Sequence, residues 1–257
     1  MKLNIVLSSS LLMLLAIVGC EKNTYQVTER TTNDGAAQVK LGFFSAYTVN
    51  PNTILYINDA PVSNTLAAPV SFPGGGLNMN GLSNGDYLLI KPGNVKIQGF
   101  RPIPSTGNIM TKLFEFNQAF IANTNYTFFI TDTAANTTGF ALEDTKVKPD
   151  SGFARFKFVN IMPNVPAIDL YRGANVASAI LVQGNVNYKT ASPSFDIALP
   201  ISDSFYIRPA GAATTTQPIA RRFFPLSNQR IYTMLARGYN GSTLATLAPN
   251  ISVIVNQ

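Results

Sequence analysis

Short runs of alternating apolar and polar residues recur along most of this 257-residue chain, and they predict β-strands. Asparagine, glycine and proline residues separate the runs, as expected for tight turns. Beyond the first 20 residues no stretch keeps a helical period. The clearest runs fall at roughly 153–160, 167–172, 177–183, 194–199, 203–208, 218–225 and 230–237, with an eighth near 251–255. The pattern therefore predicts an all-β protein.

The chain also contains an internal similarity, which predicts two copies of one unit. Four short segments recur in the same order at offsets of 106 to 117 residues: 37–41 with 154–158, 55–56 with 170–171, 90–92 with 207–209, and 126–128 with 232–234. The alternative explanation is that β-rich sequences resemble one another by composition alone. We interpret the matches as two tandem, immunoglobulin-like antiparallel β-sandwich domains, at residues 36–147 and 152–257, with a short charged linker between them.

The first 20 residues have the composition of an export signal. Lys2 supplies a positive start, and the apolar core at 11–18 is shorter than the roughly 20 residues that a membrane-spanning helix needs. Ile17-Val18-Gly19-Cys20 resembles the lipobox of bacterial lipoproteins, which are acylated on the cysteine sulfur (palmitate is one such acyl group) and cleaved before it. We therefore predict a signal peptide at 1–19, lipid attachment at Cys20, and a polar flexible tether at 20–35.

The cysteine count and the next residue refine this prediction. Cys20 is the single cysteine of the chain, so neither a disulfide nor core packing accounts for it readily. A soluble exported protein that carries a cysteine by chance is the alternative. Glu21 follows the cysteine, where inner-membrane lipoproteins of enterobacteria usually have aspartate. We expect a cell-envelope protein on the outer membrane, and display at the cell surface is compatible with the sequence.

Composition excludes much chemistry. The chain has no histidine, so serine or cysteine triads and His-ligated zinc are excluded in their usual forms. Glu143, Asp144 and Asp150 form the one acidic cluster, which we interpret as a solvated linker and not a calcium site. The formal charge of +6 comes from scattered basic residues, a pattern that does not favour nucleic-acid binding. We predict no catalytic residue, no cofactor, no metal and no enzyme activity.

One run of 18 residues resembles a known family. Residues 154–171, ARFKFVNIMPNVPAIDLY, are similar to the opening of the domain-of-unknown-function 4397 family, in which a strand ending in Val-Asn precedes a proline-containing turn. The resemblance implies tandem β-sandwiches in bacterial envelope proteins, frequent in Bacteroidetes, without an established activity. Asn160 and Asp169 belong to this run, and we expect both to bond to backbone groups; a ligand role is the alternative.

Two functional hypotheses follow. The first is a non-catalytic structural or adhesive envelope protein that presents two sandwiches to a protein or glycan partner and is held on the membrane by Cys20. The second is an accessory carbohydrate-binding lipoprotein of a glycan-uptake system, whose ligand rests on exposed aromatic residues; Phe43, Phe44 and Tyr47 are candidates, with core packing as the alternative. Asp132-Thr133-Ala134 also resembles a short O-glycosylation motif of Bacteroidetes, which leaves glycosylation of Thr133 open.

Overall fold

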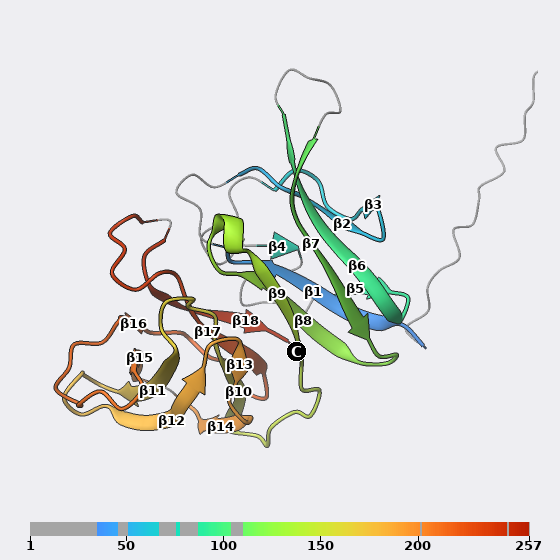
Figure 1. The fold of residues 1–257 in the computed structure, drawn as a ribbon. Coiled ribbons are helices and arrows are strands. Elements are labelled where there is room, and N and C mark those ends of the chain that lie inside the picture. Colours follow the sequence, from blue (N-terminus) through green and yellow to red (C-terminus); the bar gives the residue numbers. More distant parts are fainter. Residues whose placement is uncertain are drawn as a thin grey trace, which may run out of the picture. The chain divides into compact units, whose positions relative to one another are not determined.

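The strands of the protein assemble into four sheets, which make two β-sandwich-like halves (Figure 1). The computed structural model describes residues 35–45, 51–66, 76–77, 87–103, 110–200, 202–245 and 247–256. The predicted signal peptide at 1–19 and nearly all of the predicted tether at 20–35 lie outside these residues. Within the described ranges there is no helix long and apolar enough to cross a membrane.

The first half contains two sheets, coloured blue to green in Figure 1. One, here the β1 sheet, consists of β1 (Ala37–Phe43), β4 (Gly76–Leu77), β5 (Leu88–Ile90), β8 (Asn125–Thr131) and β9 (Thr138–Glu143). The other, the β6 sheet, has the order β3-β2-β6-β7 and consists of β2 (Ile54–Ile57), β3 (Ala60–Pro61), β6 (Gly93–Pro102) and β7 (Met110–Phe120). The short 3-10 helix η1 (Ala134–Asn136) connects β8 to β9.

The second half repeats this scheme. Its β10 sheet consists of β10 (Phe153–Asn160), β13 (Thr190–Ala191), β14 (Phe195–Ala198), β17 (Ile231–Arg237) and β18 (Asn250–Val255). Its β15 sheet has the order β12-β11-β15-β16 and consists of β11 (Ala167–Gly173), β12 (Ile180–Asn187), β15 (Ser204–Pro209) and β16 (Ala220–Arg222). The eight runs predicted for this part of the chain all contain a strand, and only the two-residue β13 was missed.

The pairing registers test the four sequence matches. Val39 of β1 pairs with Tyr126 of β8, and Phe156 of β10 pairs with Tyr232 of β17, so the first and fourth matches join equivalent strands. The second match joins β2 to β11, which occupy the same place in the strand orders of the β6 sheet and the β15 sheet. The match of 90–92 with 207–209 is wrong. Ile90 pairs with the first strand of its half, as Ile197 does, whereas residue 207 lies in the opposite sheet.

The prediction of purely antiparallel sandwiches is also wrong for one strand pair in each half. β1 runs parallel to β8, and β10 runs parallel to β17. The strands between the two members of each pair are divided between both sheets, so the later strand returns to the first in the same direction. A parallel pair needs a long connection of this kind, because a short hairpin joins only antiparallel neighbours.

Each half encloses an apolar core between its two sheets. Phe128, Leu41 and Ile97 are among the core residues of the first half, and Phe156 and Met234 among those of the second. β17, with the sequence IYTMLAR, is buried along its whole length, because the first half covers the face that its own half leaves open. β7 alternates between buried and exposed residues, as a strand with one face open to water does.

The two halves meet through the outward faces of the β1 and β10 sheets. Phe129 of β8, Val159 and Ile161 of the β10 segment, Leu235 of β17 and Ile254 of β18 form a buried apolar cluster there. No strand lies between Glu143 and Phe153, the segment that the sequence assigned to a linker. Residues 32–257 form one compact unit, and the division into two domains at 147 and 152 stays a prediction.

Candidate ligand-binding face

Some of the residues singled out from the sequence lie outside the described residues, and others have packing roles. Cys20, the predicted lipid site, lies outside the described residues, as does Tyr47, so both stay predictions. Phe43 is wholly buried in the core of the first half. Phe44 packs into the cluster between the halves, with its ring centroid 6.1 Å from that of Phe129. Phe43 and Phe44 are therefore packing residues.

Asn160 and Asp169 have the structural roles expected of them. Asn160 Oδ1 accepts a hydrogen bond from the backbone N–H of Met162, and Nδ2 donates to the carbonyl oxygens of Val165 and Val186. Asp169 accepts backbone N–H groups with both carboxylate oxygens. Both residues are buried. They fix the turns around β11.

The acidic cluster is not a solvated linker throughout. Asp144 is only 4 % exposed and accepts hydrogen bonds from the hydroxyl groups of Tyr87 and Thr127. The sequence interpretation of this residue is therefore wrong, because the second half covers the end of β9. Thr133 is half-buried, and its backbone N–H bonds to the Asp132 carboxylate. Among the described residues, no three acidic or cysteine side chains lie close enough together to hold a metal ion.

The outward face of the β6 sheet combines aromatic and polar side chains, and it is the candidate ligand-binding face of the protein. Tyr56 of β2 and Phe100 of β6 make an edge-to-face pair with ring centroids 4.9 Å apart. The Tyr56 hydroxyl reaches Met110 Sδ at 3.7 Å. Because both rings are only half-buried, they form an apolar ledge on this face. The sequence analysis used Tyr56 only as part of a repeat match.

A tight turn brings the first charged residue to the ledge. Asn58 and Asp59 connect β2 to β3, both with positive φ, which is the backbone of a two-residue hairpin turn that Asn and Asp tolerate. Asn58 Oδ1 accepts the backbone N–H of Lys96 at 2.9 Å. Lys96 Nζ then forms an ion pair with Asp59 at 2.6 Å. The hydrogen bond from Lys96 lowers the pKa of Asp59, so this carboxylate stays ionised.

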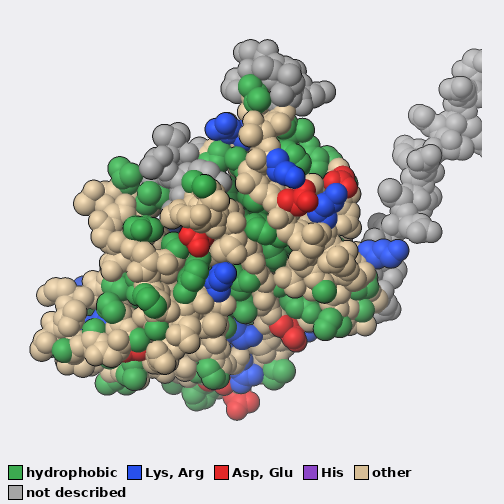
Figure 2. Space-filling model, viewed as in Figure 1, with side chains coloured by type: hydrophobic (Ala, Val, Ile, Leu, Met, Phe, Trp, Pro, Cys, Tyr) green, Lys and Arg blue, Asp and Glu red, His purple; other side chains and the backbone are tan. Residues whose placement is uncertain are grey.

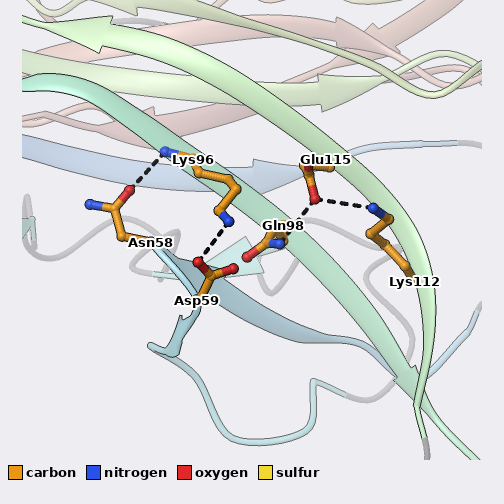
Figure 3. Close-up of polar contacts among 6 residues, drawn as sticks. All are labelled: Asn58, Asp59, Lys96, Gln98, Lys112 and Glu115. Carbon is orange, nitrogen blue, oxygen red and sulfur yellow. Dashed lines mark hydrogen bonds and ion pairs between the residues drawn. The ribbon is translucent and has the colours of Figure 1, made fainter.

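A second charged pair lies beside the first, on β7 (Figure 3). Glu115 accepts hydrogen bonds from Gln98 Nε2 at 3.0 Å and from Lys112 Nζ at 3.1 Å. These bonds, the one from Gln98 above all, lower the pKa of Glu115. In Figure 2, acidic and basic side chains alternate over β6 and β7. The charges on this face are therefore balanced in pairs.

Gln98 is the unusual member of this group. It pairs with Tyr56 across the strands and is only 5 % exposed. Its amide nitrogen donates to Glu115, whereas its oxygen Oε1 has no hydrogen-bond partner among the described residues. A buried acceptor without a partner costs about 1–3 kcal/mol. Such a group is accordingly rare in native proteins and requires an explanation.

A hollow lies next to the ledge. It has a volume of about 540 Å³ and is lined by Ile54 and Tyr56 of β2 and by residues 61–65. Tyr56 therefore lines the hollow, whereas its cross-strand neighbour Gln98 does not. Ligand sites usually combine such a hollow with aromatic side chains and a few fixed polar groups.

The equivalent face of the second half is closed. Tyr171 of β11 corresponds to Tyr56, and it pairs with Tyr206 as Tyr56 pairs with Gln98. Arg208 stacks on Tyr171 and donates to the carbonyl oxygens of Thr214 and Thr216, so the loop after β15 covers this face. Tyr206 and Arg208 are wholly buried. The outward face of the β6 sheet is thus the open member of the pair.

The comparisons with solved structures give distant similarities. A family 41 carbohydrate-binding module from streptococcal virulence factors, described as recognising alpha-glucan, is 11% identical, with a TM-score of 0.25, over 84% of this chain and 96% of that one. A proposed cell adhesion protein from Bacteroides ovatus is 11% identical, with a TM-score of 0.20, over 87% of this chain and 96% of that one. Neither similarity assigns a ligand to this chain. No curated protein matches the sequence.

A family match covers residues 39–171, just over half of the chain. It begins in β1 and ends in β11, so it spans the first half and the opening of the second. The run 154–171, which carried the resemblance in the sequence, is the end of this match and not its beginning. One match is found, so a second copy of the family domain is not shown. The chain belongs to the family described as Domain of unknown function (DUF4397).

Proposed function

We propose that this chain is a non-catalytic binding protein of the bacterial cell envelope, held on the outer membrane by lipid on Cys20, and that its partner is a glycan. The proposal combines the sequence signal for lipidation with the open face on the β6 sheet. An accessory carbohydrate-binding lipoprotein fits this description better than a purely structural one, because the face has the chemistry of a ligand site.

The observation that supports a glycan is the position of two accessible carboxylates, Asp59 and Glu115, on the same face as the aromatic ledge. The face of an aromatic ring carries negative charge density, which attracts the C–H groups of an apolar surface such as that of a sugar ring. Sugars also carry hydroxyl groups, which donate hydrogen bonds to amide and carboxylate oxygens. Tyr56 and Phe100 supply the rings, and Asp59 and Glu115 supply the oxygens.

The charge state of the face favours binding over catalysis. Glycoside hydrolysis needs one carboxylic acid that keeps its proton near neutral pH. Lys96 lowers the pKa of Asp59, and Gln98 with Lys112 lowers the pKa of Glu115. Both carboxylates are therefore ionised at neutral pH, and neither serves as a general acid.

The finer architecture belongs to the proposal as well. We take the two halves to be tandem, immunoglobulin-like copies of the family domain. The shared strand order, the parallel pair in each half, and the equivalent registers of Val39 with Tyr126 and Phe156 with Tyr232 support this. The open face would then be a specialisation of the first copy.

The anchor is tested by acyl labelling and mass spectrometry of the full chain and of a Cys20→Ala variant. The expected results are an acylated N-terminal Cys20 in the parent protein and no label in the variant. Protease shaving of intact cells reports exposure at the surface. An unmodified thiol in the mature parent protein would overturn the assignment to the membrane.

The partner is tested by affinity electrophoresis of the full chain in gels that contain soluble polysaccharides. We expect retardation by at least one polysaccharide, and we expect Tyr56→Ala to abolish it because the ledge is lost. Tyr239→Ala is the matched control, since Tyr239 is an exposed tyrosine of the second half. Equal retardation of both variants would exclude the face, and the absence of retardation by any polysaccharide would exclude the glycan.

A further inference from the structure

We propose that Lys40 and Asn256 form an intramolecular isopeptide bond, an amide bond between their side chains, in a self-reaction that Asp144 assists. The three residues come from distant segments: Lys40 lies in β1, Asp144 follows β9, and Asn256 follows β18. Together they bring an amine, a carboxamide and a carboxyl group into contact between the two halves. The reaction occurs once in each chain and involves no ligand, so it is independent of the proposed function.

The side-chain amide of Asn256 is held at both ends. Its oxygen Oδ1 accepts a hydrogen bond from Lys40 Nζ at 3.2 Å. Its nitrogen Nδ2 donates to Asp144 Oδ1 at 3.2 Å and to Thr233 Oγ1 at 2.7 Å. The chemistry of the neighbours requires this orientation, because a carboxylate accepts hydrogen bonds and an ammonium group only donates them. The carbonyl group of the amide therefore faces the amine, and the nitrogen that would leave faces the acid.

The amine is close to the atom that it would attack. A carbonyl bond is about 1.23 Å long, so Cγ of Asn256 lies at most about 4.4 Å from Lys40 Nζ. Well-placed reacting atoms are about 3–3.5 Å apart, and rotation of the flexible lysine side chain covers the difference. Lys40 Nζ also donates to the carbonyl oxygen of Val255 and lies 4.3 Å from the centroid of the Tyr87 ring. These contacts keep the amine beside the amide.

The buried surroundings favour the neutral forms that the reaction needs. Lysine attacks only as the free amine, and burial disfavours both an ammonium group and a carboxylate. Lys40 is wholly buried, and Asp144 is buried as well. Burial raises the pKa of Asp144, and the charges and hydrogen bonds around it, the charge of Lys40 first, offset this only in part. Transfer of a proton from Lys40 to Asp144 gives the neutral amine and the neutral acid.

The bonds and protons of the reaction balance. Lys40 gives one proton to the Asp144 carboxylate, and its Nζ attacks Cγ of Asn256. Asp144 passes a proton to Nδ2, with which it is already hydrogen-bonded, the Cγ–Nδ2 bond breaks, and ammonia leaves. Nζ then gives its second proton to Asp144, and an Nζ–Cγ amide bond remains. One amide replaces another and two buried charges disappear, so no further reactant is needed.

The bond would fasten the two halves to each other. It would join β1 of the first half to the residue that follows β18 of the second half, and it would enclose residues 41–255 in a covalent ring. The halves could then not separate without breaking a covalent bond. In the unreacted chain only the hydrogen bonds of Lys40 and Asn256 act at this point, and the covalent bond adds to their effect.

Peptide mapping of the full chain by mass spectrometry tests the bond. We expect a branched peptide that joins Lys40 to Asn256, with a mass lower by one ammonia than the sum of its two parts. Trypsin should no longer cleave after Lys40. Recovery of Lys40 and Asn256 in separate, unmodified peptides would overturn the proposal. This measurement on the parent protein does not depend on whether any variant folds.

Three variants separate reactivity from position. Lys40→Arg keeps a positive charge and hydrogen-bond donors, but a guanidinium group stays protonated and does not attack. Asp144→Asn keeps the volume of the side chain but cannot carry a proton between the two nitrogens. Both should lack the branched peptide, whereas Lys157→Arg should form it, because Lys157 bonds to the backbone carbonyl of Glu143. A branched peptide in Lys40→Arg would overturn the bond, and one in Asp144→Asn would overturn the role of the acid.

Discussion

Asn256, which follows β18, donates a hydrogen bond at 3.2 Å from its side-chain amide to the carboxylate of Asp144, which follows β9. The contact joins residues 112 positions apart and links the two halves. Lys40 of β1 donates to Asn256 Oδ1 at 3.2 Å and to the carbonyl oxygen of Val255. Asp144 also accepts the hydroxyl of Thr127 at 2.8 Å. A buried polar network thus lies beside the apolar cluster between the halves.

Lys40→Met should destabilise the protein strongly. Lys40 is wholly buried, donates hydrogen bonds to Val255 and Asn256, and favours the ionised form of Asp144. Replacing Lys40 removes the donor to two buried acceptors, Val255 O and Asn256 Oδ1, and a buried group left without a partner costs about 1–3 kcal/mol. Urea denaturation should show a fall in unfolding free energy of this size. Lys157→Met is the control, because Lys157 is only half-buried and bonds to a backbone carbonyl; an equal effect of the two changes would contradict the prediction.

The stability of the protein should carry a pH dependence that comes from Asp144. Burial raises the pKa of this carboxyl group, and the charge of Lys40 offsets the effect only in part. The folded state therefore binds the proton more tightly than the unfolded chain does. The stabilising contribution is complete below the unfolded pKa, about 3.9, and is lost as the pH rises through the higher folded pKa.

Comparison with Asp144→Asn isolates this contribution. The unfolding free energy of the parent protein minus that of the variant should be largest in acid and should fall as the pH rises above about 4. The hydrogen bonds that the substitution alters add a constant offset, which does not depend on pH. Denaturation curves at several pH values give the difference. A difference that is constant, or that increases with pH, would contradict a raised pKa.

The strands could be predicted from the sequence because each run alternates in the way that a sandwich requires. The buried network between the halves could not be predicted in this way. Its residues lie on strand faces that the alternating pattern predicts to be exposed to solvent. Lys40 and Asp144 look like ordinary surface charges until the β10 sheet covers them. The candidate face was missed for a related reason. Tyr56 and Gln98 are 42 positions apart, and only the pairing of β2 with β6 brings them together.

Gly99→Ala should destabilise the first half through a clash in its core. A Cβ at Gly99 would lie 2.3 Å from Phe114 Cζ, far inside van der Waals contact. Phe114 has little room to move, because it stacks on Phe116 at 5.3 Å and packs against Phe43. Overpacking of this kind costs about 1–3 kcal/mol, which thermal denaturation would report.

A double-mutant cycle identifies the clash as the cause. Phe114→Leu alone leaves a cavity, but it also makes room for the new methyl group at Gly99. The unfolding free energies of the two single variants and the double variant should therefore not be additive, and the double variant should be more stable than the sum predicts. Strict additivity would place the cost of Gly99→Ala in the backbone and not in contact with Phe114.

Asp169→Asn should lower stability without affecting binding to the open face. The two carboxylate oxygens of Asp169 accept the backbone N–H groups of Asn185 at 2.7 Å and Gly211 at 2.9 Å. An asparagine would direct its NH₂ group at one of these donors and leave a buried N–H without an acceptor, at a cost of about 1–3 kcal/mol. Asp203→Asn is the comparison, since its ion pair with Arg172 is partly exposed and should contribute less than about 1 kcal/mol. Thermal denaturation and affinity electrophoresis measure the two quantities separately. If Asp169→Asn left stability unchanged and weakened polysaccharide binding, the residue would have the ligand role that its place in the family-like run left open.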